Sequence, residues 1–253
     1  MKRIDNLAPN TIRHRHGALA RCLDWVCRKH PEVLQANPLR QLKRGFATYT
    51  SEDSKHVREA GGETRSDVER NRRLDDDEEE RILVVLAALP EAHMLFVLAL
   101  ETAMRMRECY TLGVDQVNLA QKTIHLERTK NGDGREVPMS STIYKILNRY
   151  VKANAAAIAT RDGRLFSFWS GDSKVVALDA TTVDVSLLFR GIFQSARVEN
   201  FRFHDLRHEA TCRLYEKTTL SDVLIARITG HRDVRMLRRY ASLRGSDLAA
   251  RLW

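Results

Sequence analysis

The most informative part of the chain is residues 204–240, which read HDLRHEATCRLYEKTTLSDVLIARITGHRDVRMLRRY. The pattern predicts three helices, near residues 204–216, 221–229 and 233–241. Gly230 directly follows the second of them and is a natural C-cap, because helices often end on a glycine in the left-handed conformation. We therefore expect a helical region with one sharp turn at this glycine.

Apolar segments upstream predict further helices. The acidic residues 75–80 precede the apolar run 82–89, and acidic side chains favour the first turn of a helix because they complement its dipole. Pro90 ends that run, and a second apolar helix is predicted from about Glu91 to Met104. Other helices are predicted after Thr11, over residues 143–151 behind a Ser140-Ser141-Thr142 cap, and over residues 183–192.

The spacing of apolar residues changes between residues 113 and 139. Three short strands are predicted, over residues 115–119, 123–127 and 135–138. Asn131-Gly132-Asp133-Gly134 is typical of a hairpin turn between the last two strands. The predicted fold class is therefore mainly α with a small antiparallel β-sheet.

Charge and composition divide the chain into three parts. The net charge is +9, and residues 1–46 carry 10 basic and 3 acidic side chains on a helical pattern. Residues 47–73 have few apolar residues and contain Gly61-Gly62, which predicts a flexible linker before a large domain over residues 74–253. A basic surplus favours nucleic acid as a partner, although a solvated surface explains such a surplus equally well.

Several classes of protein are disfavoured. No apolar run reaches the roughly 18 residues of a membrane span, and the start lacks the apolar stretch of a signal peptide, so a cytoplasmic protein without membrane contact is expected. The four cysteines, which form neither a metal-type pair nor a disulfide framework, are expected to be buried free thiols: Cys22, Cys27, Cys109 and Cys212.

His204 and Arg207 form the first candidate pair. They lie three residues apart at a helix start, so both side chains point to the same face. An arginine fork suits two phosphate oxygens, and a neighbouring histidine can donate to the same phosphate or move a proton. Taken alone, this spacing is common by chance and a structural salt bridge explains it better.

His231 and Tyr240 follow nine residues apart. A tyrosine with a pKa near 10 is a poor nucleophile unless nearby cations favour its phenolate form. Taken singly, Tyr240 is more typical of a core or surface tyrosine. The segment nevertheless supplies four cations around it, Arg232, Arg235, Arg238 and Arg239.

Two further cations upstream complete a phosphate site. Arg105 ends a strongly apolar helix, which is an unusual position for an arginine unless it enters a site. Lys130 lies in the turn between two predicted strands, where its ammonium group can protonate a leaving oxygen.

Together these motifs resemble those of the tyrosine recombinases, the lambda-integrase-like family of site-specific DNA strand-exchange enzymes. Residues 102–108, Thr-Ala-Met-Arg-Met-Arg-Glu, match the family's Thr-Gly-x-Arg-x-x-Glu with Ala103 in the place of the glycine. Thr129-Lys130, with Arg135 and Val137-Pro138, matches the family's lysine hairpin. His204 and Arg207 match His-x-x-Arg, with His208 also typical. Gly230, His231 and Tyr240 match Gly-His-(eight residues)-Tyr.

The resemblance spans about residues 74–245 and, more weakly, residues 8–45. It implies the family's catalytic domain, a DNA breaking-rejoining fold, over residues 74–253. A partial helical core-binding domain, which clamps DNA, is expected over residues 1–46. Because this part resembles only the later helices of that domain, ending at Asn37-Pro38, we expect either a fragment or a reduced member of the family.

The resemblance implies cleavage of double-stranded DNA by transesterification, with no metal, ATP or other cofactor. The energy of the broken bond stays in a 3′-phosphotyrosyl link until another 5′ hydroxyl attacks it. The implied site comprises Tyr240 as nucleophile, Arg105 and Arg207 as stabilisers of the phosphate charge, Lys130 as general acid, His204 as an aid to proton transfer at the tyrosine, and His231 as a hydrogen-bond donor to the phosphate.

Four protomers on two DNA sites are expected, with a monomer in the absence of DNA. The location expected is the cytoplasm of a bacterium, with the protein bacterial or phage-derived and associated with the nucleoid. The apolar tail formed by Leu248, Leu252 and Trp253 would either dock on a neighbouring protomer or fray. Two alternatives stay open: a type IB topoisomerase-like enzyme that relaxes one duplex, and a catalytically impaired or truncated DNA-binding remnant of a mobile element.

Overall fold

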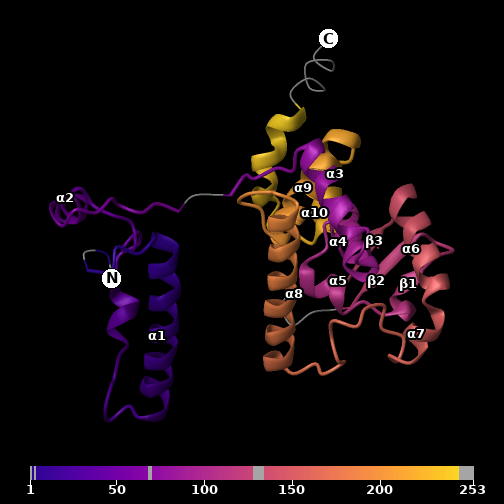
Figure 1. Cartoon of the computed structure of the whole chain (residues 1–253). Coiled ribbons are helices and arrows are strands. Elements are labelled where there is room, and N and C mark those ends of the chain that lie inside the picture. The colour runs from indigo at the N-terminus through magenta and orange to yellow at the C-terminus, as the bar shows by residue number, and fades with distance from the viewer. Residues whose placement is uncertain (1, 3, 68–69, 128–133, 245–253) are drawn as a thin grey trace. The chain divides into compact units, whose positions relative to one another are not determined.

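The computed structural model describes residue 2 and residues 4–67, 70–127 and 134–244, without the side chains of residues 241–244. Its internal contacts divide the chain into two compact units, residues 1–70 and residues 71–253 (Figure 1). Each unit has its own helices and is described separately.

The first unit contains one long helix and two short ones, α1 (Pro9–Lys29), η1 (Pro38–Gln41) and α2 (Ser51–Glu59). Helix α1 begins at Pro9, two residues before the predicted cap at Thr11. The side-chain amide of Asn37 donates to the carbonyl oxygen of Ala20 at 2.8 Å, which holds the segment around η1 against α1. The chain thus turns back at the Asn37-Pro38 pair.

Helix α2 lies within residues 47–73, where composition predicts a flexible linker. Thr50 and Asp53 cap it reciprocally, since the Thr50 hydroxyl accepts from Asp53 N at 3.1 Å and Asp53 Oδ2 accepts from Thr50 N at 3.1 Å. Such a capping box satisfies two backbone donors and stabilises a helix without many apolar residues. The boundary at residue 70 falls near the end of the predicted linker.

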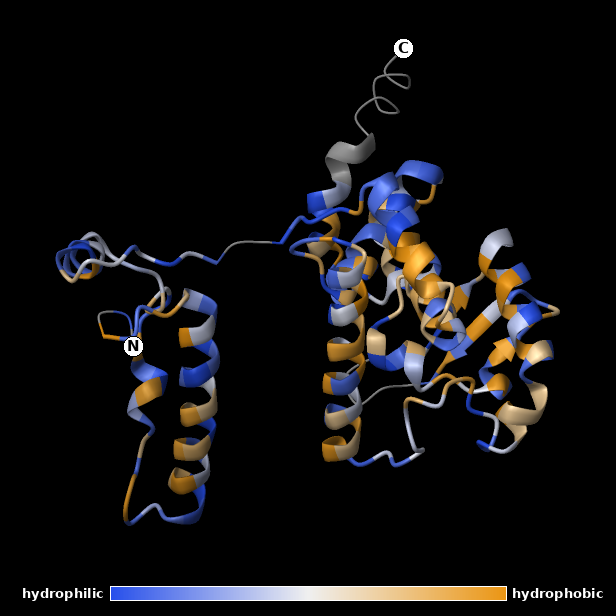
Figure 2. Cartoon of the chain, viewed as in Figure 1, coloured by the Kyte–Doolittle hydropathy of each residue, from blue (hydrophilic) through white to orange (hydrophobic). Residues whose placement is uncertain are grey.

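The second unit is mostly helical, and its only described sheet is small and antiparallel, as the sequence predicts. Its helices surround a core centred on α4, whose apolar residues stand out in Figure 2. The elements are α3 (Asp76–Leu86), α4 (Pro90–Thr102), α5 (Met106–Tyr110), η2 (Val114–Gln116), β1 (Val117–Asn118), β2 (Thr123–Leu126), β3 (Arg135–Pro138), α6 (Ser141–Ala153), α7 (Ala155–Ala159), α8 (Val175–Ser195), α9 (Phe203–Lys217), α10 (Asp222–Thr229) and η3 (Val234–Arg244).

Local signals fix most helix starts in this unit. Asp75 is the N-cap of α3, Pro90 is the first residue of α4, and the Ser140 hydroxyl accepts from Ile143 N at 3.2 Å at the start of α6. Gly230 ends α10 with a φ of 73°, the left-handed conformation expected of a glycine C-cap. These predictions are confirmed.

The sheet has the order β1-β2-β3, with both pairs antiparallel. Ile124 pairs with Val117 on one side and Val137 on the other, and Ile124 and Val137 are fully buried. Of the predicted turn at residues 131–134, only Gly134 lies within the described residues.

Two separate apolar clusters stabilise the second unit. The larger one contains nearly all of α4, which packs between α6 and α9. The smaller one lies between α9, α10 and η3 and consists of Cys212, Tyr215, Ile225, Ala226, Leu237 and Tyr240. The last of the three predicted C-terminal helices is thus present, but as a 3-10 helix.

The cysteines are free, but their burial differs from the prediction. Cys109 and Cys212 are buried, whereas Cys22 is exposed and Cys27 is half-buried on α1. Among the residues that the structure describes, no helix is both long and apolar enough to cross a membrane.

Candidate active site

Arg105 enters the site at a sharp turn after α4. Ala103 ends that helix in the left-handed conformation, with a φ of 54°, and Arg105 becomes the N-cap of α5. Its guanidinium donates from Nη1 to Glu108 Oε1 at 2.9 Å and from Nη2 to the carbonyl oxygen of Gly230 at 3.0 Å. Since its side chain is 48% exposed, this cation stays accessible to an anion from solvent.

Glu108 is a buried carboxylate held between two arginines. Arg135, on β3, donates to both of its oxygens, at 3.0 and 2.7 Å, and Arg105 N donates to Oε2 at 2.8 Å. Burial raises the pKa of Glu108, but the hydrogen bonds and charge of Arg135 and then of Arg105 bring it down to about 2. The carboxylate is therefore ionised at any physiological pH.

Arg207 lies on α9 and is almost completely buried. Nη1 donates to the carbonyl oxygen of Ala103 at 2.6 Å, and Nη2 lies 3.4 Å from Nε2 of His231. Burial, followed by the charge of Arg105, lowers the pKa of Arg207 to about 10, so it remains a cation at neutral pH. Two guanidinium groups from separate helices thus lie close enough to repel each other, which favours an anion between them.

His231 directly follows the glycine turn and is neutral. Because an arginine only donates, Nε2 of His231 accepts from Arg207, and Nδ1 then carries the proton and donates to the Thr229 hydroxyl at 2.6 Å. Burial and then the charges of Arg207, Arg105 and Arg135 lower the pKa of His231 to about 4. A bound phosphate would offset these charges and restore the proton on Nε2.

His204 belongs to the same group of side chains. It lies in the first turn of α9, one turn before Arg207, and keeps an exposed surface. Partial loss of hydration and then the charge of Arg207 lower the pKa of His204. The structure therefore brings Arg105, Arg207, His204 and His231 together, whereas Lys130 lies outside the described residues.

Tyr240 is on η3 and is 4% exposed. Its hydroxyl lies 2.9 Å from Nδ1 of His208, and its ring stacks on Tyr215 with a centroid distance of 5.5 Å. Burial raises the pKa of Tyr240 despite the nearby charge of Arg239. The sequence motif includes His208 without a role for it, and its position next to Arg207 is the signal that it faces a different side of α9.

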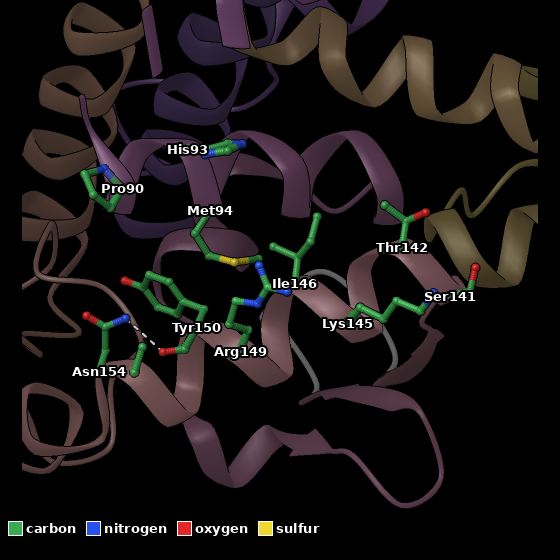
Figure 3. A pocket seen from close by; sticks show the side chains of 11 residues that line it. Pro90, His93, Met94, Ser141, Thr142, Lys145, Ile146, Arg149, Tyr150 and Asn154 are labelled. Atoms are coloured by element: carbon green, nitrogen blue, oxygen red, sulfur yellow. Dashed lines mark hydrogen bonds between the residues drawn. The ribbon is translucent and has the colours of Figure 1, made fainter. Parts of the chain in front are cut away.

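An open pocket lies elsewhere, between α4 and α6. It has a volume of about 620 Å³, and its lining includes His93, Lys145 and Tyr150 (Figure 3). None of the described candidate residues lines it. The candidate site is a group of charged side chains at helix ends, and it is separate from this pocket.

A family model described as the phage integrase family matches residues 72–246, well over half of the chain. The chain belongs to the phage integrase family. Its resemblance to the tyrosine recombinases is thereby confirmed, and the matched region covers every element that carries a candidate residue.

Relatives in sequence are recombinases and integrases. The shufflon-specific DNA recombinase of Escherichia coli is 35% identical over 184 residues, which is 72% of this chain and 43% of that protein. The integrase of Salmonella phage P22 is 26% identical over 157 residues, 59% of this chain and 38% of that protein. The chain therefore spans about two fifths of the length of these two relatives.

The fold is shared with solved structures of the same family. The Tn1549 transposon integrase in complex with a circular intermediate DNA has a TM-score of 0.61 at 17% identity, over 96% of this chain and 80% of that one. XerH site-specific recombinase bound to its palindromic difH substrate has a TM-score of 0.54 at 21% identity, over 73% of this chain and 54% of that one.

Proposed function

We propose that this chain is the catalytic part of a site-specific recombinase that cuts and rejoins DNA strands through a 3′-phosphotyrosyl intermediate. One observation carries the proposal: two guanidinium groups, Arg105 and Arg207, converge beside His231, with Tyr240 on the adjoining 3-10 helix. Family membership and the shared fold support it.

The phosphate would bind to the arginine pair. Arg105 is accessible and Arg207 is held rigidly by the Ala103 carbonyl, so both can donate to non-bridging oxygens without rearranging. Groups fixed in this way stabilise the charge that grows in the transition state, and removing one typically lowers the rate about 10²–10³-fold. His231 would add a third donor once the phosphate has restored its proton.

Cleavage exchanges one phosphoester bond for another. The Tyr240 oxygen bonds to phosphorus while the bond to the 5′ oxygen breaks, and the tyrosine loses its proton as the 5′ oxygen gains one. Lys130 would supply the proton to the 5′ oxygen, and His204 would assist removal of the hydroxyl proton from the tyrosine. The reverse attack by another 5′ hydroxyl rejoins the strands, so neither a metal nor ATP is required.

Tyr240 is at rest in this structure. Its hydroxyl is buried and bound to His208, and burial opposes formation of the phenolate. We therefore propose that Tyr240 moves toward the arginine pair when DNA binds. The 3-10 geometry of η3 suits such a change, because its hydrogen bonds are weaker than those of an α-helix.

The partner is double-stranded DNA. Four protomers are proposed to act on two sites, because two duplexes contain four strands and each protomer supplies one Tyr240. The basic residues of 1–46 would clamp the DNA as a partial core-binding domain, with residues around 47–73 joining it to the catalytic domain. A bacterial or phage-derived protein acting at the nucleoid fits this activity.

A nicked suicide duplex tests the proposal. DNA that flanks the gene supplies candidate sites, and a radiolabelled duplex nicked next to the scissile phosphate traps the covalent adduct. We expect an adduct with the wild-type chain in EDTA and none with Tyr240→Phe. Adduct formation by Tyr240→Phe would refute the nucleophile, binding without any adduct would indicate a DNA-binding remnant, and relaxation of any supercoiled plasmid would indicate a topoisomerase.

A further inference from the structure

Arg135 lies at the junction of the three elements that form the phosphate site. We infer that Arg135 is a positioning residue for strand cleavage, an inference that rests on the proposed function. Arg135 aligns Arg105 through Glu108, and it aligns His231 through the turn at the end of α10. It touches neither the nucleophile nor, on this proposal, the phosphate.

The contacts of Arg135 reach two separate elements. From β3, its Nη1 and Nη2 donate to the two oxygens of Glu108 on α5, at 3.0 and 2.7 Å. Its Nε donates to the carbonyl oxygen of Ile228 in the last turn of α10 at 3.0 Å. Because three donors of one planar group are used on two elements, the group fixes their relative position.

The turn after α10 is shaped around this guanidinium. A Cβ atom at Gly230 would lie 2.8 Å from Cζ of Arg135, closer than real side-chain contacts allow. Gly230 is therefore favoured by its φ of 73°, and a side chain there would displace the Arg135 guanidinium. The next residue is His231, so the position of Arg135 determines where the backbone places the His231 side chain.

Arg105 closes the set of contacts. It donates to Glu108 on one side and to the carbonyl oxygen of Gly230 on the other. These hydrogen bonds form a closed ring of contacts, which runs from Arg135 to Glu108, then to Arg105, then to the turn at Gly230 and back to Arg135. Breaking the ring at Arg135 leaves Arg105 with a buried carboxylate that has lost its main partner, and leaves the turn without its support.

The side chains of the ring are buried except at Arg105. The Arg135 and Glu108 side chains are 10% and 8% exposed, compared with 48% for Arg105. A group this buried acts on DNA through its neighbours. Arg135 also follows the predicted general acid Lys130 by five residues along the chain.

A pH profile separates positioning from simple structural support. Among the described residues, the charged groups that act on Glu108 are Arg105 at the start of its own helix, Arg135 on β3 and Arg207 on α9. Arg135 is the strongest of the influences that lower the pKa of Glu108. Without it the pKa of the Glu108 carboxylate rises, so Arg105 loses its charged partner at a higher pH than in the wild-type chain.

The experiment measures the single-turnover rate of adduct formation on the suicide duplex between pH 5 and pH 8. Arg135→Gln should lower the rate at pH 7.5 about 10²-fold, the scale of a misplaced catalytic group, with unchanged DNA affinity and circular dichroism. The acid limb of its rate profile should move to higher pH. Arg135→Lys should lower the rate less, because it keeps the positive charge although it lacks the forked guanidinium. If the glutamine variant does not fold, the lysine variant decides the test.

Arg107→Gln is the matched control. Arg107 lies on α5 between Arg105 and Glu108, but it pairs with Asp179 at 2.6 Å and should leave the cleavage rate unchanged. Wild-type rates in both Arg135 variants, or an equal loss at every pH with a lower melting temperature, would overturn the inference. If the wild-type chain itself forms no adduct, the proposed function fails instead.

Discussion

The hydroxyl of Tyr240 lies 2.9 Å from Nδ1 of His208, in a cluster that leaves the tyrosine 4% exposed. His208 and Arg207 are consecutive on α9, yet Arg207 contacts Ala103 and His231. The resting nucleophile is thus held by His208, whereas its neighbour Arg207 is held by different partners. An attack on DNA requires the first contact to break.

His208→Phe is expected to speed cleavage. An aromatic ring stays, but the hydrogen bond that holds Tyr240 at rest is lost, and such a bond contributes about 1 kcal/mol, or roughly fivefold in rate. The measurement is the single-turnover rate of adduct formation, with His93→Phe in the pocket of Figure 3 as the control. A fall of about 10²-fold would instead identify His208 as a general base.

The second unit should lose stability in mildly acidic buffer. The unfolded His231 takes up a proton near its ordinary pKa of 6.5, whereas the folded one does so only at about 4. The unfolded state therefore binds more protons over this window, and the free energy of unfolding falls as the pH drops through it. Melting temperatures between pH 7.5 and 4.5 should decline less in His231→Gln than in the wild-type chain. A decline of the same slope in the variant would contradict the assignment.

Ala103→Gly should change the free energy of unfolding by less than about 1 kcal/mol. Releasing an L-residue from the left-handed conformation gains about 1–2 kcal/mol, but a buried methyl worth about 0.8 kcal/mol and backbone entropy worth about 0.5–1 kcal/mol are lost. Urea unfolding compares it with Ala99→Gly in the interior of α4, where nothing offsets the loss. Equal destabilisation of the two variants would show that Ala103 carries no strain.

Glu209→Gln should destabilise the second unit by about 3 kcal/mol, because it removes the anion from a buried ion-pair network. This carboxylate on α9 is 1% exposed and accepts from Arg73 at 2.6 Å, Arg213 at 2.9 Å and Leu74 N at 3.2 Å. Glu216→Gln removes the more exposed partner of the same Arg73 and should change stability by less than about 1 kcal/mol. Urea unfolding distinguishes them, and equal effects would mean that burial does not matter here.

Lys130→Ala should slow cleavage of ordinary DNA but not of DNA with sulfur in place of the scissile 5′ oxygen. A thiolate leaves without a proton, so a general acid becomes unnecessary. The measurement is the ratio of the rates of adduct formation on the two substrates. Arg105→Ala is the comparison variant, and it should be slow on both substrates. A variant that stays slow on the sulfur substrate would point to phosphate binding as the role of Lys130.

Much of the fold follows from local signals. The caps Asp75 and Ser140, the glycine at 230 and the alternating pattern of the strands lie within a few residues of the features they determine, so the sequence predicts them. Helix α2 was not predicted, because its capping box acts through polar side chains in a segment with few apolar residues.

The candidate site was predictable as a set of residues but not as a set of contacts. Motif spacing selects Arg105, Arg207 and His231, whereas the ring through Arg135 depends on how β3 meets α5 and α10. Similarly, nothing local indicates that Tyr240 meets His208, since that contact depends on the packing of η3 against α9. The role of His204 in proton transfer stays a prediction.

The two apolar clusters of the second unit give its phosphate-binding groups and its nucleophile different supports. Helix α9 contributes Leu206 to the larger cluster, whereas Tyr240 belongs to the smaller one with Leu237. Regions with fewer buried contacts open at lower free energy. On the proposed function, mild heat or denaturant would therefore displace the nucleophile before the groups that bind the phosphate, and a chain in that state would occupy a recombination site as a competitor of its own active copies.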